Sequence, residues 1–247
     1  MSIKTTLNYS PNFDSKKRKI KHIKFIIFHY TGMKKESEVI TRLTDIKSKV
    51  SSHYLIKNNG EIITLVPDLF IAWHAGFSSW KNFKSLNKNS IGIEICNPGH
   101  NFKYKKFSKK QIQSILKLSK FLIKKFKIKK KNILGHSDIA PSRKKDPGEK
   151  FPWEYFAKHQ VGLWHTLSLI KLRKNRMQKI DQISKKYFFN NLLKIGYSTK
   201  IPKDIKKDKF LILVIKAFQR RFRQELINGK IDQECLLISQ NLAKKLS

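Results

Sequence analysis

Short apolar segments recur through the first 135 residues and predict β-strands. Residues 25–28 (Phe-Ile-Ile-Phe) are wholly apolar, which is typical of a strand buried on both faces. Residues 90–96 alternate, so their three isoleucines are expected on one side of a strand and Glu94 on the other. Residues 133–134 predict a further short strand that leads into a polar loop.

Helical periodicity and turn residues fill the stretches between these strands. Residues 36–50 carry an apolar face with acids early and lysine late, as the helix dipole favours. Residues 108–126 begin with a capping box and keep the 3.6-residue period, and residues 151–172 predict a third, aromatic-rich helix. Between the first two of these helices, residues 53–65 predict a β-hairpin around an Asn-Asn-Gly turn.

After residue 180 the pattern changes to three helical stretches without any strand signal. These are residues 181–195, 210–226 and 232–246, and residues 173–180 precede them as a linker or exposed helix end. The alternation before residue 173 predicts an α/β fold, a central mixed β-sheet flanked by helices. We therefore expect a main domain over residues 1–175 and a small three-helix domain over residues 176–247.

The net charge of +37 on 247 residues is extreme, and lysine outnumbers arginine 46 to 8. Both parts of the chain are basic, and the positive charge is not concentrated in one segment. Nucleic-acid-binding proteins usually concentrate their positive charge and use arginine freely. The excess of Lys, Ile and Asn indicates an A/T-rich coding bias. It is also compatible with attraction to an acidic polymer such as a wall glycopolymer.

No transmembrane segment or disulfide framework is expected. The chain lacks a run of 18 apolar residues, and its two cysteines are too few for a disulfide framework. Residues 1–12 are polar and show no signal-peptide core, so a cytoplasmic location is expected, with the periplasm or cell envelope as the alternative. The oligomeric state is left open.

Two histidines and one aspartate stand where a catalytic metal site is expected. His29 follows the apolar run 25–28, and His136 and Asp146 lie on one proline-bearing stretch, residues 135–148. Two imidazoles and a carboxylate leave tetrahedral zinc one open position. Glu94, in an otherwise apolar strand, is a candidate general base, and Lys144 is a candidate oxyanion partner.

Spacing alone does not select these residues. His29 could be a hydrogen-bonded core histidine, His136 a loop cap, and Glu94 the partner of a nearby lysine. The alternative ligands are Asp138, which looks more like an Asx-turn former, His53, His74 and Cys96.

Several separated motifs occur together in a known order. They are His29-Tyr30-Thr31, Ser52-His53-Tyr54-Leu55-Ile56, Ala72-Trp73-His74-Ala75-Gly76, Ser90-Ile91-Gly92-Ile93-Glu94 and Gly135-His136-Ser137-Asp138-Ile139-Ala140-Pro141 with Lys144-Lys145-Asp146-Pro147-Gly148. With them, residues 8–170 resemble the zinc-dependent N-acetylmuramoyl-L-alanine amidases of type 2, a family that includes AmiD- and AmpD-like enzymes and peptidoglycan recognition proteins. The lead-in at residues 8–15 is most similar to the AmiD-like members.

The resemblance implies a role for each candidate. His29, His136 and Asp146 would bind one Zn²⁺, Glu94 would act as general base and Lys144 would stabilise the oxyanion. The enzyme would cut the amide between (anhydro-)N-acetylmuramic acid and the L-alanine of the stem peptide during peptidoglycan turnover or recycling. Substrate contacts are expected at four positions: Tyr30, Trp73, His74 and Arg143.

The C-terminal residues resemble a small helical peptidoglycan-binding domain. The likeness is carried by residues 217–222 and 229–232, and Cys235 departs from it because threonine is more usual there. The alternative is a helical cap that only stabilises the enzyme.

Two other functions compete with the amidase. A non-catalytic peptidoglycan-recognition protein would bind without cleavage, and a nucleic-acid binder would lose its ligand steeply with salt and would need no zinc. The presence of all five amidase residues favours the enzyme.

Overall fold

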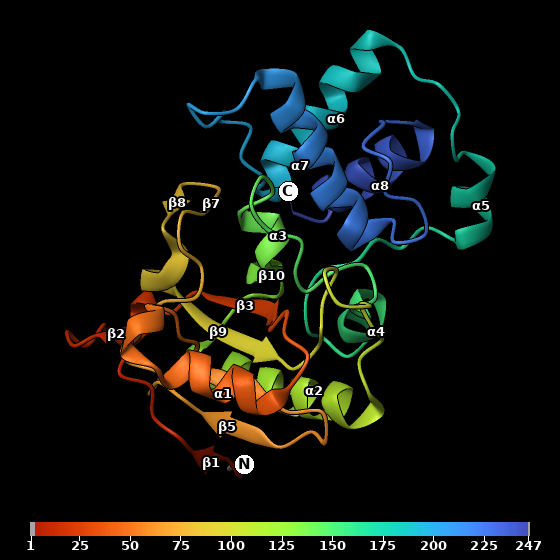
Figure 1. The fold of residues 1–247 in the computed structure, drawn as a ribbon. Helices are drawn as coiled ribbons and strands as arrows, with labels where there is room; N and C mark the ends of the chain where they lie inside the picture. Colours follow the sequence, from red (N-terminus) through yellow and green to blue (C-terminus); the bar gives the residue numbers. More distant parts are fainter. Residues whose placement is uncertain (1–2, 247) are drawn as a thin grey trace.

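The computed structural model describes residues 3–246. Within these residues a six-stranded mixed sheet has the order β1-β5-β4-β9-β3-β10 (Figure 1). The strands are β1 (Thr6–Leu7), β5 (Ile62–Thr64), β4 (Tyr54–Ile56), β9 (Ser90–Ile95), β3 (Phe25–Tyr30) and β10 (Ile133–Gly135). β4 and β5 form the predicted antiparallel hairpin, and all other neighbours are parallel. The predicted α/β fold with a mixed central sheet is confirmed.

Helices α2 (Lys109–Phe126) and α4 (Trp153–Lys158) cover one face of the sheet. Ile115, Leu118 and Leu122 of α2 are fully buried in the same hydrophobic cluster as the three isoleucines of β9. Ser108 caps α2: its hydroxyl accepts from the Gln111 N–H, while the Gln111 side chain accepts from the Ser108 N–H, as the capping box predicts.

The other face is shared between two groups of helices. Val39 and Leu43 of α1 (Glu36–Thr44) pack against Leu55 and Ile63 of the hairpin. Beside α1, the short helix α3 (His136–Ile139) lies against β3 and β10, and the C-terminal helices pack over α3 (Figure 1). They are α6 (Gln182–Ile195), α7 (Lys207–Phe222) and α8 (Gln233–Lys244), which confirms the three predicted helices with shifted ends.

One hydrophobic cluster runs from the sheet into the C-terminal helices. It joins Phe25 and Ile27 of β3 to Phe188 of α6 and Phe218 of α7, all buried. The division into separate domains at residues 1–175 and 176–247 stays a prediction. The shared cluster means that α6–α8 pack against the rest of the chain, with α3 between them and the sheet.

The single helix predicted over residues 151–172 is wrong. The structure has α4, then an irregular segment, then α5 (Leu169–Lys174). The backbone leaves the helical region at Gln160 and Gly162, which have φ of 70° and 92°. Phe151, Trp153 and Phe156 are buried in one cluster, whereas Tyr155 is exposed and Trp164 lies beyond the break, so the aromatic residues do not form one helical stripe.

Three further boundaries differ from the predictions. The helix predicted over residues 36–50 ends at Thr44, because Asp45 caps a separate 3₁₀ turn, η2 (Ile46–Ser48). The strand predicted over residues 25–28 continues through Tyr30. The stretch after β10 is not simply a loop, since it opens with a short helix, α3 (His136–Ile139).

Small elements connect these layers. They are the two-stranded sheets β2 (Phe13–Asp14) with β6 (Ile71–Ala72) and β7 (Ser79–Trp80) with β8 (Phe83–Lys84), and the 3₁₀ turns η1 (Ile20–His22), η3 (Leu86–Asn89) and η4 (Lys130–Asn132).

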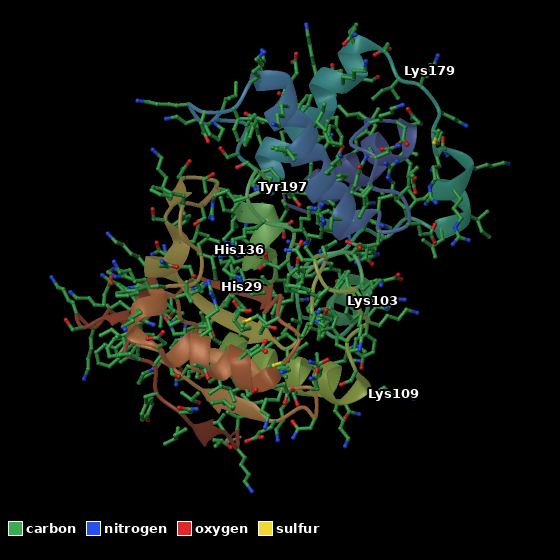
Figure 2. All side chains as sticks on the ribbon, viewed as in Figure 1. His29, Lys103, Lys109, His136, Lys179 and Tyr197 are labelled. Carbon is green, nitrogen blue, oxygen red and sulfur yellow. The ribbon has the colours of Figure 1, made fainter. Side chains whose placement is uncertain are left out.

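The basic side chains are spread over the surface. Lys103, Lys109 and Lys179 point outwards from separate parts of the molecule (Figure 2). None of the helices formed by residues 3–246 has both the length and the apolar character needed to cross a bilayer.

Replacing the cap residue should measure what the capping box contributes. Ser108→Ala removes the acceptor for Gln111 N–H and the donor to the Asn58 carbonyl, so we expect a loss of about 1–2 kcal/mol of unfolding free energy. Urea unfolding followed by circular dichroism measures this. Ser37 lies inside α1, is exposed and has no side-chain hydrogen bond to any residue of 3–246, so Ser37→Ala should change the unfolding free energy by less than about 0.5 kcal/mol. Equal effects would contradict the cap.

Candidate active site

Parallel pairing brings three predicted site residues to one edge of the sheet. His29 is near the end of β3, Glu94 near the end of β9, and His136 directly follows β10. β3 pairs in parallel with both β9 and β10, and His29 lies opposite Glu94. The carboxyl ends of such strands meet at one edge, where ligands bind in open α/β sheets. Figure 2 shows His29 and His136 close together below the C-terminal helices.

Three potential metal-binding atoms meet at a single buried point. His29 Nδ1 lies 2.9 Å from His136 Nδ1 and 3.0 Å from Asp146 Oδ2, and the last two are 3.1 Å apart. The three residues are 1%, 3% and 6% exposed. Among the described residues they form the group of side chains whose geometry could hold a metal ion.

A chain of hydrogen bonds fixes the tautomer of His29. Ser90 Oγ donates its one proton to the Leu86 carbonyl at 2.7 Å, so it must accept from His74 Nε2 at 3.1 Å. Neutral His74 then accepts at Nδ1, and its partner, His29 Nε2 at 3.0 Å, is the donor. His29 Nδ1 therefore carries a lone pair directed at His136 and Asp146.

His136 is oriented in the same way by a backbone carbonyl. Its Nε2 donates to the Ala75 oxygen at 3.1 Å, so Nδ1 is the ring nitrogen that faces His29 and Asp146. Arg143 Nη2 also donates to this oxygen and to the Phe77 carbonyl. Such second partners are what set the ring orientation of metal-binding histidines.

Close backbone approach makes room for the His74 chain. A Cβ on Gly92 would lie 2.4 Å from the His74 ring, so β9 needs glycine at this position. The register pairs Gly92 with Ile27, two residues before His29. The glycine in the Ser-Ile-Gly-Ile-Glu motif thus has a packing role in the site.

The electrostatics keep His29 and Asp146 in the protonation states that bind metal. Burial, followed by the charge of His136, lowers the pKa of His29 to about 4. For Asp146, burial alone raises the pKa, but the charge and hydrogen bonds of the two histidines outweigh it and hold it well below its usual range. A neutral His29 imidazole and an ionised Asp146 carboxylate are the result at neutral pH.

Glu94 faces the same site with an unsatisfied oxygen. Its Oε2 is buried and has no hydrogen-bond partner among the described residues. Burial, together with the negative charge of Asp146 and against the positive charge of Lys144, raises its pKa to about 8. A carboxyl group with a pKa near the working pH can both take and return a proton.

The sequence-predicted site residues other than His29 line one cleft of about 410 Å³, and His29 contacts two of them, His136 and Asp146. It is bordered by Tyr30, Trp73, His74, Glu94, His136, Arg143, Lys144 and Asp146. Trp73 is half-buried and its Nε1 donates to Asp14. Both ring nitrogens of His74 are engaged in the chain described above, so it is an orienting group more than a free substrate contact.

The alternative ligands lie outside the three-atom cluster. His53 Nδ1 accepts from the Gly92 N–H, and Cys96 is buried under α1. Asp138 is not a surface turn former: it is buried and paired with Arg221 of α7.

Ser90, His100 and Glu149 contribute to the site but were missed in the sequence. Ser90 lies inside a recognised motif, which could have signalled a role. His100 contacts Tyr30 and Glu149 contacts His100, contacts for which the sequence offers no signal.

Comparison with known proteins supports this picture. The family model for N-acetylmuramoyl-L-alanine amidase matches residues 18–149. The curated relative AmiD of Escherichia coli is 36% identical over 235 residues, which covers 90% of this chain and 83% of AmiD. The chain belongs to the N-acetylmuramoyl-L-alanine amidase family. The enzyme class predicted from the sequence is confirmed.

Two solved structures match this amidase over most of its length. One is AmiD from E. coli in complex with its substrate anhydro-N-acetylmuramic acid-L-Ala-D-γ-Glu-L-Lys, with a TM-score of 0.77, 34% identity and coverage of 91% and 90% of the two chains. The other is AmpDh3 from Pseudomonas aeruginosa in complex with an anhydromuramic pentapeptide, with a TM-score of 0.78, 28% identity and coverage of 95% and 96%. The likeness therefore extends into the C-terminal helices.

The raised pKa of Glu94 predicts that replacing this residue in the metal-free protein stabilises the fold by an amount that depends on pH. Below about pH 4.5 the carboxyl is protonated in both the folded and the unfolded chain. Between 4.5 and about 8 only the unfolded chain ionises it, so stability is lost as the pH rises. The excess unfolding free energy of Glu94→Gln over wild type should grow across this window and level off above it, measured by denaturant unfolding. A difference that is constant with pH would contradict the shift.

Proposed function

We propose that this amidase is a zinc enzyme that hydrolyses the amide between N-acetylmuramic acid and the L-alanine of the stem peptide, in peptidoglycan turnover or recycling. The observation that carries the proposal is the convergence of two imidazole lone pairs and one carboxylate oxygen beside Glu94. Three electron-rich atoms at one buried point favour a cation between them.

His29 Nδ1, His136 Nδ1 and Asp146 Oδ2 would hold the zinc ion. The donor set of two nitrogens and one oxygen fits zinc in a catalytic site with one open position. When bound, zinc supplies a Lewis acid that activates water and polarises the amide carbonyl. The hydrogen bonds that orient the two imidazole rings would contribute to the zinc affinity.

Glu94 is proposed as the general base and then the general acid. Its partnerless Oε2 is free to accept a proton from the attacking water, and the carboxyl can return that proton to the leaving L-alanine nitrogen. Lys144 stands near enough to lower the pKa of both Glu94 and His29, and its ammonium would stabilise negative charge on the former carbonyl oxygen.

The cleft suits an acidic peptide attached to a sugar. Arg42, Arg143, Lys144 and Lys145 border it, and stem peptides carry several carboxylates. Tyr30 and Trp73 offer aromatic surfaces beside the metal-binding residues. Since two similar structures hold anhydro-muropeptides, we propose anhydro-N-acetylmuramyl peptides as substrates.

We predict that the purified protein releases stem peptide from an anhydro-muropeptide and that zinc chelation stops the release. Mass spectrometry of the products measures both. Glu94→Ala should keep zinc and lose turnover, whereas His136→Ala should lose both. Binding without cleavage would instead indicate the non-catalytic recognition role.

Lys144→Met should lower kcat on the order of a hundredfold, because it removes the cation that faces the developing oxyanion. Initial rates on the same muropeptide measure this. Lys103→Met, which removes an equal charge from the exposed surface, is the matched control and should leave kcat unchanged. A similar small effect of both changes would remove Lys144 from the mechanism.

His74→Phe should weaken zinc binding about 10- to 100-fold, because it removes the acceptor for His29 Nε2. The His29 ring then loses the hydrogen bond that orients it. Competition with a chelating dye measures the affinity. His22→Phe, at an exposed position outside the cleft, should bind zinc like the wild type. Unaltered affinity in His74→Phe would contradict the orienting chain.

A further inference from the structure

Two consecutive arginines of α7 reach residues of the active site from the C-terminal helices. The side chain of Arg221 is 3% exposed and that of Arg220 9% exposed, so both are enclosed between α7 and the sheet domain. Neither the family model, which ends at residue 149, nor the site chemistry above includes them.

Arg221 holds the helix that begins with His136. Its Nη1 donates to Asp138 Oδ2 at 2.6 Å and its Nη2 to the Ile133 carbonyl at 2.9 Å. Its guanidinium also stacks on the Trp153 ring, 4.3 Å from the centroid. One side chain thereby ties the start of β10 to the middle of α3.

Asp138 is saturated by donors from three directions. Besides Arg221, Oδ2 accepts the Gly135 N–H at 2.8 Å, and Oδ1 accepts the hydroxyl of Tyr197 at 2.6 Å. Figure 2 shows Tyr197 above His136, between α3 and the C-terminal helices. A four-residue helix has too few internal hydrogen bonds to hold its own orientation. The direction of α3, and with it that of the His136 ring, therefore depends on Asp138 and its two C-terminal donors.

Arg220 faces the opposite wall of the cleft. Its Nε lies 3.9 Å from Glu149 Oε2, which in turn contacts His100 Nε2 at 3.0 Å. His100 Nδ1 contacts the Tyr30 hydroxyl at 2.9 Å. Tyr30 and His100 both line the cleft, so this chain runs from α7 to the substrate side of the site.

We propose that Arg221 and Tyr197 are positioning residues for the metal site and that Arg220 is a positioning residue for the substrate wall. The C-terminal helices then complete the active site. This inference rests on the zinc amidase function proposed above. It differs from the role of a separable wall-binding module, because it requires α6–α8 for metal affinity even on a small soluble substrate.

The use of arginine here fits the geometry. The chain contains only 8 arginines beside 46 lysines. A planar guanidinium can donate to a carboxylate and a carbonyl at once and stack on an indole, whereas a lysine ammonium offers a point charge. Arg221 makes all three contacts, so lysine would keep the charge but lose the geometry.

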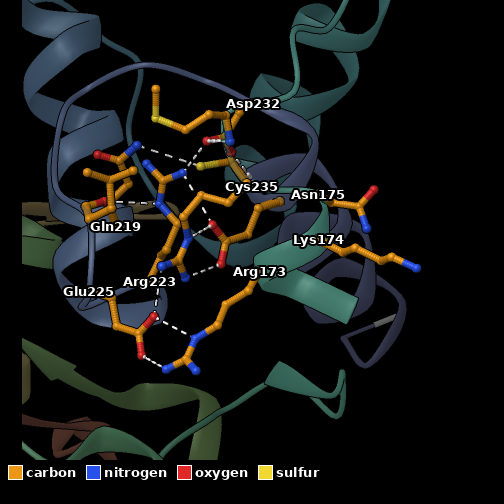
Figure 3. Close-up of polar contacts among 12 residues, drawn as sticks. Arg173, Lys174, Asn175, Gln219, Arg223, Glu225, Asp232 and Cys235 are labelled. Carbon is orange, nitrogen blue, oxygen red and sulfur yellow. Dashed lines mark hydrogen bonds and ion pairs between the residues drawn. The ribbon is translucent and has the colours of Figure 1, made fainter. Parts of the chain in front are cut away.

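Arg223 provides a matched control for general stability. Its side chain is 1% exposed and pairs with Asp232 and, at 3.5 Å, with Glu234. Figure 3 shows it inside the polar cluster of the C-terminal helices, with Asp232, Gln219 and Cys235. It lies two residues from Arg221 and touches no residue of the cleft. Replacing it with lysine tests the cost of losing the guanidinium geometry at a buried ion pair in this region.

The experiment compares Tyr197→Phe, Arg221→Lys, Arg220→Met and Arg223→Lys with wild type. Zinc affinity is measured by dye competition, unfolding free energy by urea, and kcat and KM on an anhydro-muropeptide. We expect Tyr197→Phe and Arg221→Lys to weaken zinc binding about tenfold, as loss of a supporting partner does. Arg220→Met should raise KM with unchanged zinc affinity, and Arg223→Lys should lower stability only.

The outcomes separate this inference from the proposed function. Suppose that the wild type binds zinc and cleaves the substrate, and that Tyr197→Phe and Arg221→Lys bind zinc as tightly as Arg223→Lys. The C-terminal helices are then only a stabilising cap, and the inference is wrong. If Arg221→Lys does not fold, Tyr197→Phe, which loses a single hydroxyl, still decides the matter. A wild-type protein that neither binds zinc nor cleaves would overturn the proposed function itself.

Discussion

The site depends on three electron-rich atoms that are held together by hydrogen bonds anchored on backbone carbonyls. The Leu86 carbonyl accepts a hydrogen bond from the Ser90 hydroxyl, and this determines the tautomer of His74 and then that of His29. The Ala75 carbonyl accepts from Nε2 of His136 and so orients that ring. Both Nδ1 lone pairs then face Asp146 at about 3 Å. Electron-rich atoms so close together repel one another unless a cation lies between them. The order of donors and acceptors in these hydrogen bonds therefore favours a metal ion at this point.

The sheet topology turns this local order into a cleft. β3 lies between β9 and β10 in parallel, so the ends that carry His29, Glu94 and His136 are adjacent. Helix α1 covers one half of this face, and α3, with the C-terminal helices packed over it, covers the other. The opening between them is lined by basic and aromatic residues around the three ligand atoms, which suits an acidic sugar peptide.

Much of the site was predictable because its chemistry is concentrated in short motifs. The apolar run before His29, the alternation around Glu94 and the turn in the hairpin are local signals, and the structure agrees with them. Tertiary contacts over long separations were not predictable. The position of Asp138 before Ile-Ala-Pro favours an Asx turn, and its actual partner, Arg221, is 83 positions away in the sequence. For His100 and Glu149 the sequence offers no signal. The helix predicted over residues 151–172 was wrong because the backbone leaves the helical region at Gln160 and Gly162.

Crystallography of the zinc-soaked protein, with anomalous data at the zinc edge, tests the central claim most directly. The account predicts one strong anomalous peak per chain, about 2.0–2.2 Å from His29 Nδ1, His136 Nδ1 and Asp146 Oδ2. A peak bound instead by His53, His74 or Cys96, or no peak at the three residues at saturating zinc, would contradict it.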